Sequence, residues 1–153
     1  MDKILAYLNN YFYKFGEKGT YNISENKVQV KGKYITGQYI RITGSYLNDT
    51  VAKVISVEGD IITLEKANNE EFEGVIFSLA VPPALIELFG KIEEFESKST
   101  PSNLSSESFG NYSYSVATNK NGENMTWKDV FKNDLRPYRK IYDSIGKVKI
   151  IDN

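Results

Sequence analysis

The hydrophobic pattern of the chain changes its period twice, and this limits the folds that the chain can adopt. Residues 2–15 carry apolar side chains at helical spacing, residues 20–80 alternate with a period of two, and residues 82–98 return to helical spacing. Alternation is typical of half-buried strands, so the middle segment predicts five or six short antiparallel strands. The sequence therefore predicts an α+β fold, in which a small helical core carries an inserted antiparallel β subdomain, either a sheet or a partly closed barrel.

The same changes of period predict how the chain is divided. They fall at Gly16 and Val81, and the helices on either side of the strands would meet if the strands were looped out. We therefore expect residues 1–16 and 81–153 to form a helical core with a C-terminal docking tail. Residues 17–80 are expected to form the inserted β subdomain, which would be peripheral to that core.

The segment after Val81 has the clearest helical pattern in the chain. Two prolines stand at its start, where a missing N–H group costs little. Gly90 lies in the middle of the helix and predicts close packing there. The apolar stripe of this helix consists of Leu85, Leu88, Phe89, Ile92 and Phe95.

A further short helix is predicted near the C-terminus. Thr126 has the position of a helix cap, and Asp129 follows at the spacing of a capping box. Pro137 ends the helix at or before Arg136, because the residue before a proline disfavours helical geometry.

Cysteine and histidine are both absent from the 153 residues. Their absence excludes disulfides, thiol nucleophiles, Ser-His catalytic pairs and zinc sites built on Cys or His. Catalysis by carboxylates alone is compatible with the composition, but no motif indicates it, and no glycine-rich nucleotide motif is present. We therefore expect a protein that is not an enzyme and that uses no metal and no cofactor.

No apolar run approaches the ~20 residues that are needed to span a bilayer. The apolar stretch at the N-terminus is interrupted by Asn9, Asn10 and Lys14, and no small-residue cleavage site follows it. We expect a cytoplasmic or virion protein without a membrane partner.

The net charge of −1 is unevenly distributed along the chain. Residues 1–57 contain eight Lys and Arg against four Asp and Glu, residues 58–96 two against ten, and residues 97–153 nine against six. A solvated acidic surface would explain this pattern, and so would opposite charges on different faces that favour head-to-tail association. The acidic segment argues against generic nucleic-acid binding, which requires a basic footprint.

The stretch SSESFGNYSYSVA, residues 105–117, is too polar for a core and too aromatic for an ordinary loop. Gly110 and Asn111 both tolerate the backbone of a tight turn. After the turn, Tyr112 and Tyr114 alternate with serines, which predicts a strand. Because a lone strand exposes unpaired backbone groups, we expect it to pair with an edge in its own chain or in a neighbouring subunit.

The C-terminal segment RPYRKIYDSIGKVKIIDN is basic and carries two tyrosines. A solvated terminus is one interpretation. The other is a docking tail with aromatic anchors, in which KVKII adds as a strand to the sheet of a partner.

A small barrel would also suit oligonucleotide binding, which combines stacking aromatics with cations. The alternative function is therefore a small nucleic-acid-binding protein that uses the β insert. The residues that support it are Tyr21, Tyr34, Tyr39, Lys27, Lys31, Lys33 and Arg41.

The segments LIELFGKIEEF, SESFGNYSYS and LRPYRKI follow one another, separated by a polar linker and by a capped short helix. In this order they resemble the C-terminal half of the head–tail connector (neck adaptor) family of tailed phages. GQYIRITGSYLND and EFEGVIFSLAVPPALIEL resemble a branch from prophages of Gram-positive bacteria, which has a β-rich insertion after the first helix. The resemblance covers roughly residues 34–142 and is most specific in Ser106–Ser115 and Leu135–Ile141.

The chain departs from that branch at two turns. Gly110-Asn111 stands where the branch often has Gly-Gly or Gly-Asp, and the turn remains possible with Asn. Thr50 stands where a glycine is common, so that turn is expected to differ in type.

The resemblance implies a structural neck protein that forms a homo-oligomeric ring, usually of about twelve copies. The ring would lie between the portal protein and the stopper or tail-terminator protein, in a virion assembled in the bacterial cytoplasm. Genomic DNA would pass through its channel without sequence-specific binding. Because bound phosphates would hold the DNA back, we expect the acidic residues 58–96 to line or flank the channel.

Two sets of contact residues are expected. The contact with the adjacent subunit is assigned to Ser106, Glu107, Phe109, Gly110, Tyr112 and Tyr114. Docking to the portal or to another neck protein is assigned to Arg136, Tyr138, Arg139, Lys140 and Tyr142.

Overall fold

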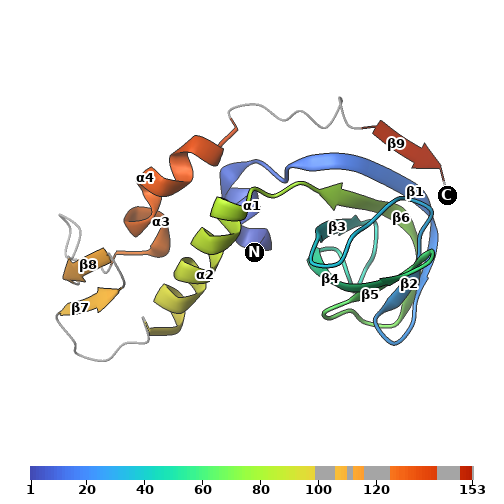
Figure 1. Ribbon diagram of the computed structural model, residues 1–153, viewed down its shortest axis with the longest axis horizontal. Helices are drawn as coiled ribbons and strands as arrows, with labels where there is room; N and C mark the ends of the chain where they lie inside the picture. Colours follow the sequence, from blue (N-terminus) through green and yellow to red (C-terminus); the bar gives the residue numbers. More distant parts are fainter. Residues whose placement is uncertain (99–105, 110–111, 116–124, 141–148, 153) are drawn as a thin grey trace. The chain divides into compact units, whose positions relative to one another are not determined.

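The computed structural model describes residues 1–98, 106–109, 112–115, 125–140 and 149–152 (Figure 1). It contains a seven-stranded mixed sheet, a separate two-stranded sheet, one long helix and several short ones. The chain divides into two compact units, one of Met1–Val81 with Lys140–Asn153 and one of Pro82–Arg139. The predicted α+β class with a β-rich subdomain is confirmed.

The first helix, α1 (Asp2–Leu8), is shorter than the helix predicted for residues 2–15. Asn9 adopts the left-handed conformation with a φ of 50°, and its N–H donates to the carbonyl of Ala6 at 3.0 Å. Asparagine visits this conformation more readily than most residues, so the helix ends here. The predicted helix end at Gly16 is wrong, because Gly16 already lies in a strand.

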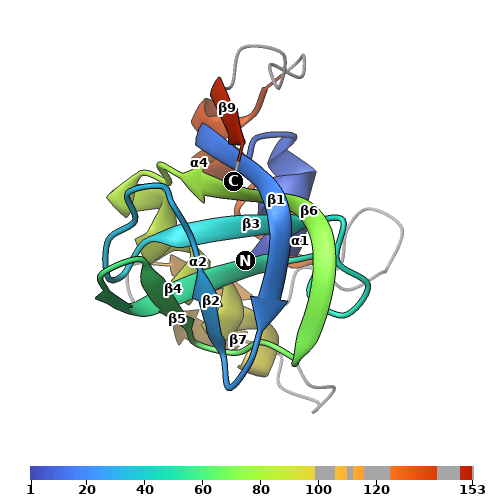
Figure 2. The same cartoon turned by 90° about the vertical axis from the view of Figure 1, so that its right-hand side faces the viewer.

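Six strands of the large sheet occupy the alternating segments of the sequence, and a seventh comes from the C-terminal region. They are β1 (Tyr13–Ile23), β2 (Lys27–Gln29), β3 (Tyr39–Thr43), β4 (Val51–Glu58), β5 (Ile61–Leu64), β6 (Glu70–Leu79) and β9 (Lys149–Asp152). Their order is β2-β5-β4-β3-β6-β1-β9, and every neighbouring pair except β1 and β9 is antiparallel. An isolated bridge between Ser24 and Lys27 brings the end of β1 beside β2, so the first six strands curl toward a closed barrel (Figure 2).

The inward-facing side chains of these strands form one apolar core. In β3, for example, Ile40 and Ile42 are buried, as the alternation predicts. The rings of Tyr21 and Phe72 lie 5.5 Å apart between β1 and β6. The other core residues are Ile23, Val28, Val30, Tyr34, Ala52, Val54, Ile62, Leu64 and Ile76.

One carboxylate is fully buried beside this core. Glu17 of β1 accepts the N–H groups of Lys31 and Gly32, each at 2.7 Å, and lies 3.5 Å from the hydroxyl of Tyr34. Burial and the Glu17 charge raise the pKa of Tyr34 far above its usual value, so this hydroxyl remains a donor. Glu17 therefore fixes the path of the segment between β2 and β3.

In the second unit, α2 (Pro83–Lys98) begins at the predicted prolines, and its predicted apolar stripe is buried. The close packing predicted at Gly90 is wrong. Gly90 is exposed, and a Cβ atom built there meets nothing within 4 Å.

Two short helices follow, α3 (Trp127–Val130) and α4 (Lys132–Leu135), and then the 3-10 turn η1 (Arg136–Tyr138). The predicted capping box between Thr126 and Asp129 is confirmed, with the Thr126 N–H donating to Asp129 Oδ2 at 2.9 Å. The helix is interrupted at Phe131, whose ring meets that of Phe95 edge-on at 5.9 Å between centres.

Candidate interaction surface

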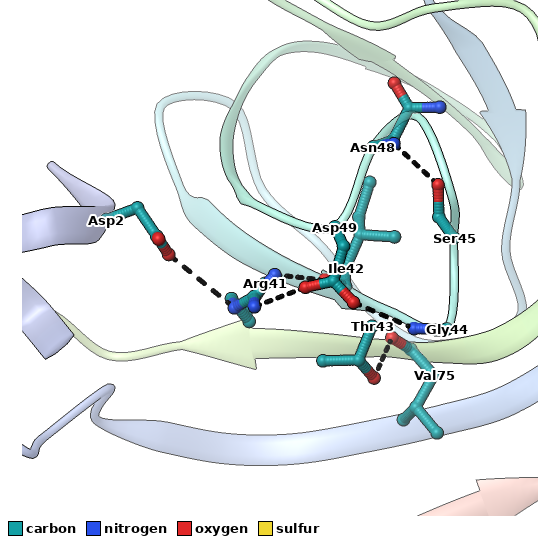
Figure 3. A network of polar contacts seen from close by, with 9 residues as sticks. All are labelled: Asp2, Arg41, Ile42, Thr43, Gly44, Ser45, Asn48, Asp49 and Val75. Atoms are coloured by element: carbon teal, nitrogen blue, oxygen red, sulfur yellow. Dashed lines mark hydrogen bonds and ion pairs between the residues drawn. The ribbon is translucent and has the colours of Figure 1, made fainter.

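The loop between β3 and β4 presents two apolar side chains to solvent. Tyr46 is 93% exposed and Leu47 is 50% exposed. We call the segment from Gly44 to Thr50 the Tyr46 loop. Its backbone is fixed by hydrogen bonds and by an ion pair, which Figure 3 shows in part.

Two glycines allow the Tyr46 loop to begin close against β6. Gly44 has a φ of +87°, and a Cβ atom there would lie 2.8 Å from the carbonyl oxygen of Glu73. On β6, a Cβ atom at Gly74 would lie 2.1 Å from the carbonyl oxygen of Thr43. No larger residue fits between these backbones without moving them.

The carboxylate of Glu70, the first residue of β6, holds the tip of the loop. It accepts hydrogen bonds from the Ser45 hydroxyl (2.5 Å), the Tyr46 N–H (2.8 Å), the Leu47 N–H (3.1 Å) and the Asn48 side-chain amide (2.9 Å). These hydrogen bonds lower the pKa of Glu70. The bond from Ser45 has the largest effect, and those from the two backbone N–H groups and from Asn48 have smaller ones. The two residues that expose apolar side chains therefore have their main chain bound to one ionised group.

Two asparagines, Asn48 and Asn68, hold the loop through side-chain hydrogen bonds. The side chain of Asn48 is almost fully buried, accepts the N–H of Asn68 at 2.7 Å and donates to the carbonyl of the same residue at 3.1 Å. The Asn68 amide in turn donates to the Leu47 carbonyl at 3.2 Å. These pairs satisfy the buried polar groups of the loop and so favour a single conformation.

An ion pair closes the base of the loop (Figure 3). Arg41 Nη2 lies 2.5 Å from Asp49 Oδ1, and the other oxygen of Asp49 accepts the Gly44 N–H at 3.2 Å. The Arg41 Nε atom also lies 3.6 Å from an oxygen of Asp2, and its guanidinium lies 5.7 Å from the centre of the Tyr11 ring. Burial works to lower the pKa of Arg41, but the hydrogen bond and charge of Asp49 and the charge of Asp2 raise it. The cation is thus bound to carboxylates of its own chain.

This arrangement suits recognition of a partner. A tyrosine on a fixed backbone offers a large contact area at little entropic cost, and tyrosine is frequent among residues that dominate binding. Within the described residues, no three acidic side chains are placed to hold a metal ion together, and no helix is long and apolar enough to cross a membrane.

The structure gives the SSESFGNYSYSVA strand a partner within its own chain. β7 (Ser106–Phe109) pairs antiparallel with β8 (Tyr112–Ser115), and Phe109 lies opposite Tyr112. This two-stranded hairpin contains five of the six residues predicted for the subunit contact. Gly110 lies outside the described residues.

Four of the predicted docking residues lie where the chain passes from the second unit, which ends at Arg139, to the last part of the first unit, which begins at Lys140. Arg136 and Tyr138 are in η1, and Arg139 and Lys140 follow it; Tyr138 is half-buried and the other three are exposed. Tyr142 lies outside the described residues. Strand β9 contains most of the KVKII motif and pairs with β1 of the same sheet.

Only some of the residues predicted for oligonucleotide binding are accessible to a nucleic acid. Tyr21 and Tyr34 are buried in the core, 2% and 6% exposed, so neither can stack on a base. The guanidinium of Arg41 forms ion pairs with the carboxylates of Asp2 and Asp49. Lys27, Lys31 and Lys33 are exposed and Tyr39 is half-buried.

The Tyr46 loop was not predicted as a site, because TGSYLND has the composition of a turn. The available signal was an aromatic and a leucine inside that turn; their anchor, Glu70, lies 24 residues away from Tyr46.

Comparison of the chain with protein-family models, curated proteins and solved structures finds no match in any of the three.

Proposed function

We propose that this protein is a structural neck component of a tailed phage or prophage. It is a head–tail connector that forms a ring between the portal and the stopper or tail-terminator protein, around a channel for DNA. It would belong to the virion and assemble in the bacterial cytoplasm.

The observation that carries the proposal is the β7–β8 hairpin. Among the described residues its strands pair only with each other, and a two-stranded hairpin alone is at best marginally stable in water. A neighbouring subunit would supply the additional surface that the hairpin needs. The same segment carries the most specific part of the resemblance to connector proteins.

The Tyr46 loop supports an assembly role independently. It presents an apolar pair on a backbone that is already ordered, which lowers the entropic cost of binding. In the proposed neck it contacts another protein of the assembly.

The charge distribution suits a channel that does not retain DNA. Glu58, Glu65, Glu71 and Glu73 are exposed around β4–β6. We place this acidic segment along or beside the channel, where it repels phosphates. The exposed guanidinium groups of Arg136 and Arg139 are assigned to a partner, since arginine binds carboxylates through two parallel hydrogen bonds.

The test is assembly in the presence and absence of the portal protein, measured by light scattering. The portal is included because connector subunits can be monomeric before assembly. We expect a ring, or a stable complex with the portal. The variant Tyr112→Ala should weaken assembly without changing thermal unfolding, whereas Ser113→Ala on the same strand serves as the control. A portal mixture that shows neither a ring nor a complex would contradict the proposal.

Nucleic-acid binding by the β subdomain is the alternative, and the exposed lysines 27, 31 and 33 are the observation that favours it. It predicts a monomer that binds single-stranded DNA with an affinity that falls steeply as salt rises. Loss of that binding in a variant with all three lysines changed to alanine would support this alternative.

A further inference from the structure

The large sheet ends in a strand that comes from the far end of the chain. β1 pairs with β6 along most of its length, but its other edge pairs with β9 over only four positions, from Phe15 opposite Lys149 to Lys18 opposite Asp152. β9 is the last strand in the order, so without it the first part of β1 would be an open edge.

The contact of β9 depends mainly on its main chain. Lys149 is exposed, Ile150 is 48% exposed and Ile151 is half-buried. Parallel strands are usually covered on both faces, so an edge strand that leaves an isoleucine half in water is unusual. Strand addition of this kind derives its affinity from backbone hydrogen bonds, which the same strand of another copy can make equally well.

The path of the chain permits such an exchange. The chain leaves the first unit at Val81 and returns at Lys140, whose N–H donates to the carbonyl of Leu8 at 2.9 Å. From Lys140 to Lys149 an extended chain reaches up to about 30 Å. That is about the diameter of a small domain, so β9 can reach the β1 edge of an adjacent copy while Lys140 stays in place.

We propose that β9 is exchanged between neighbouring copies, so that residues 149–152 of one chain complete the sheet of the next at β1. The inference rests on the ring proposed above and supplies one of its contacts. Each copy donates one strand and accepts one, which is a head-to-tail contact that closes into a ring when the rotation allows it. The exchanged and unexchanged forms contain the same strand pairing, and the high local concentration of subunits in a ring makes the exchanged pairing accessible.

The absence of native cysteine allows a direct test by disulfide trapping. Lys18 and Asp152 are opposite each other in the β1–β9 register. Neighbouring strands lie about 4.8 Å apart, which falls within the range of about 4.4–6.8 Å that a disulfide accepts between Cα atoms. The variants Lys18→Cys and Asp152→Cys are prepared as separate chains, mixed, assembled with and without portal, and oxidised. Lys27→Cys, an exposed position on β2 opposite Thr63, replaces Lys18→Cys in the control mixture.

If the strand is exchanged, a disulfide should link the Lys18→Cys chain to the Asp152→Cys chain. A non-reducing gel of that mixture should then show a band at the mass of two chains, and the control mixture should not. A chain with both Lys18→Cys and Asp152→Cys should then give a ladder of linked chains. If the assembled double variant gives only an internally closed single chain, strand exchange is overturned and the ring itself stands. If light scattering instead shows no assembly with portal, the proposed function fails, and the strand exchange that rests on it fails with it.

Discussion

The Glu70 carboxylate accepts the main-chain N–H of Tyr46 at 2.8 Å, while Tyr46 as a residue is 93% exposed. An ionised group thus holds the backbone of the most exposed large apolar residue among those that the structure describes. This relationship makes the conformation of the loop dependent on the charge at Glu70.

Changing Glu70 to Gln should loosen the Tyr46 loop without unfolding the protein. The folded-state pKa of Glu70 is lowered, so its stabilisation is fully present above the unfolded pKa of about 4.3 and is lost as pH falls through the folded value. The amides of Tyr46 and Leu47 should therefore exchange hydrogen faster in the variant at neutral pH. The difference in melting temperature between the two proteins should shrink as the solution is acidified, and a constant difference would contradict the assignment.

Removing the exposed side chains of the loop should weaken association but leave folding intact. A double variant Tyr46→Ala and Leu47→Ala is expected to lose about 2 kcal/mol of binding free energy, or about 30-fold in affinity, toward the protein proposed as its partner. Ile55→Ala on β4 is the matched control, because Ile55 is 48% exposed but lies outside the loop. Titration calorimetry with the purified partner measures the effect, and equal losses in both variants would remove the specific role of the loop.

Gly74→Ala and Gly90→Ala should change stability in opposite directions. At Gly74 the added methyl would lie 2.1 Å from the Thr43 carbonyl oxygen, so the variant should lose about 3 kcal/mol or more. At Gly90 the added methyl meets nothing within 4 Å, and replacing a helical glycine should gain up to about 1 kcal/mol. Urea unfolding of both variants measures the difference.

Glu17→Ala should destabilise the β subdomain by about 3 kcal/mol, because the N–H groups of Lys31 and Gly32 lose their shared acceptor. Lys18→Ala, at the adjacent exposed position of β1, should remain within about 0.5 kcal/mol of the parent. Equal effects in thermal unfolding would show that Glu17 is not the link between β1 and the segment after β2.

The strands could be predicted because one face of each is buried. Alternation over Tyr39–Thr43 and the stripe on α2 report burial directly, and both are where the sequence places them. The first helix could not be delimited in this way. Phe15 matches helical spacing, but Asn9 adopts a left-handed conformation and the chain enters a strand at Tyr13.

The candidate surface was harder to predict, because its defining contacts join distant parts of the sequence. Nothing local to Tyr46 indicates that Glu70 holds its backbone. Similarly, KVKII was identified as a strand for addition to a sheet, but its four-residue register on β1 depends on the tertiary path of the chain.

β9 and β1 pair with each other but lie at opposite ends of the sequence, so they are synthesised at different times. β1 leaves the ribosome early and β9 follows more than a hundred residues later, which at synthesis rates of up to about 20 residues per second is a delay of several seconds. During that interval β6 can already pair with β1, while the opposite edge of β1 remains unpaired until β9 has been made. On a polysome, nascent copies in this state lie close together, so the first strand to reach an open edge need not come from the same polypeptide.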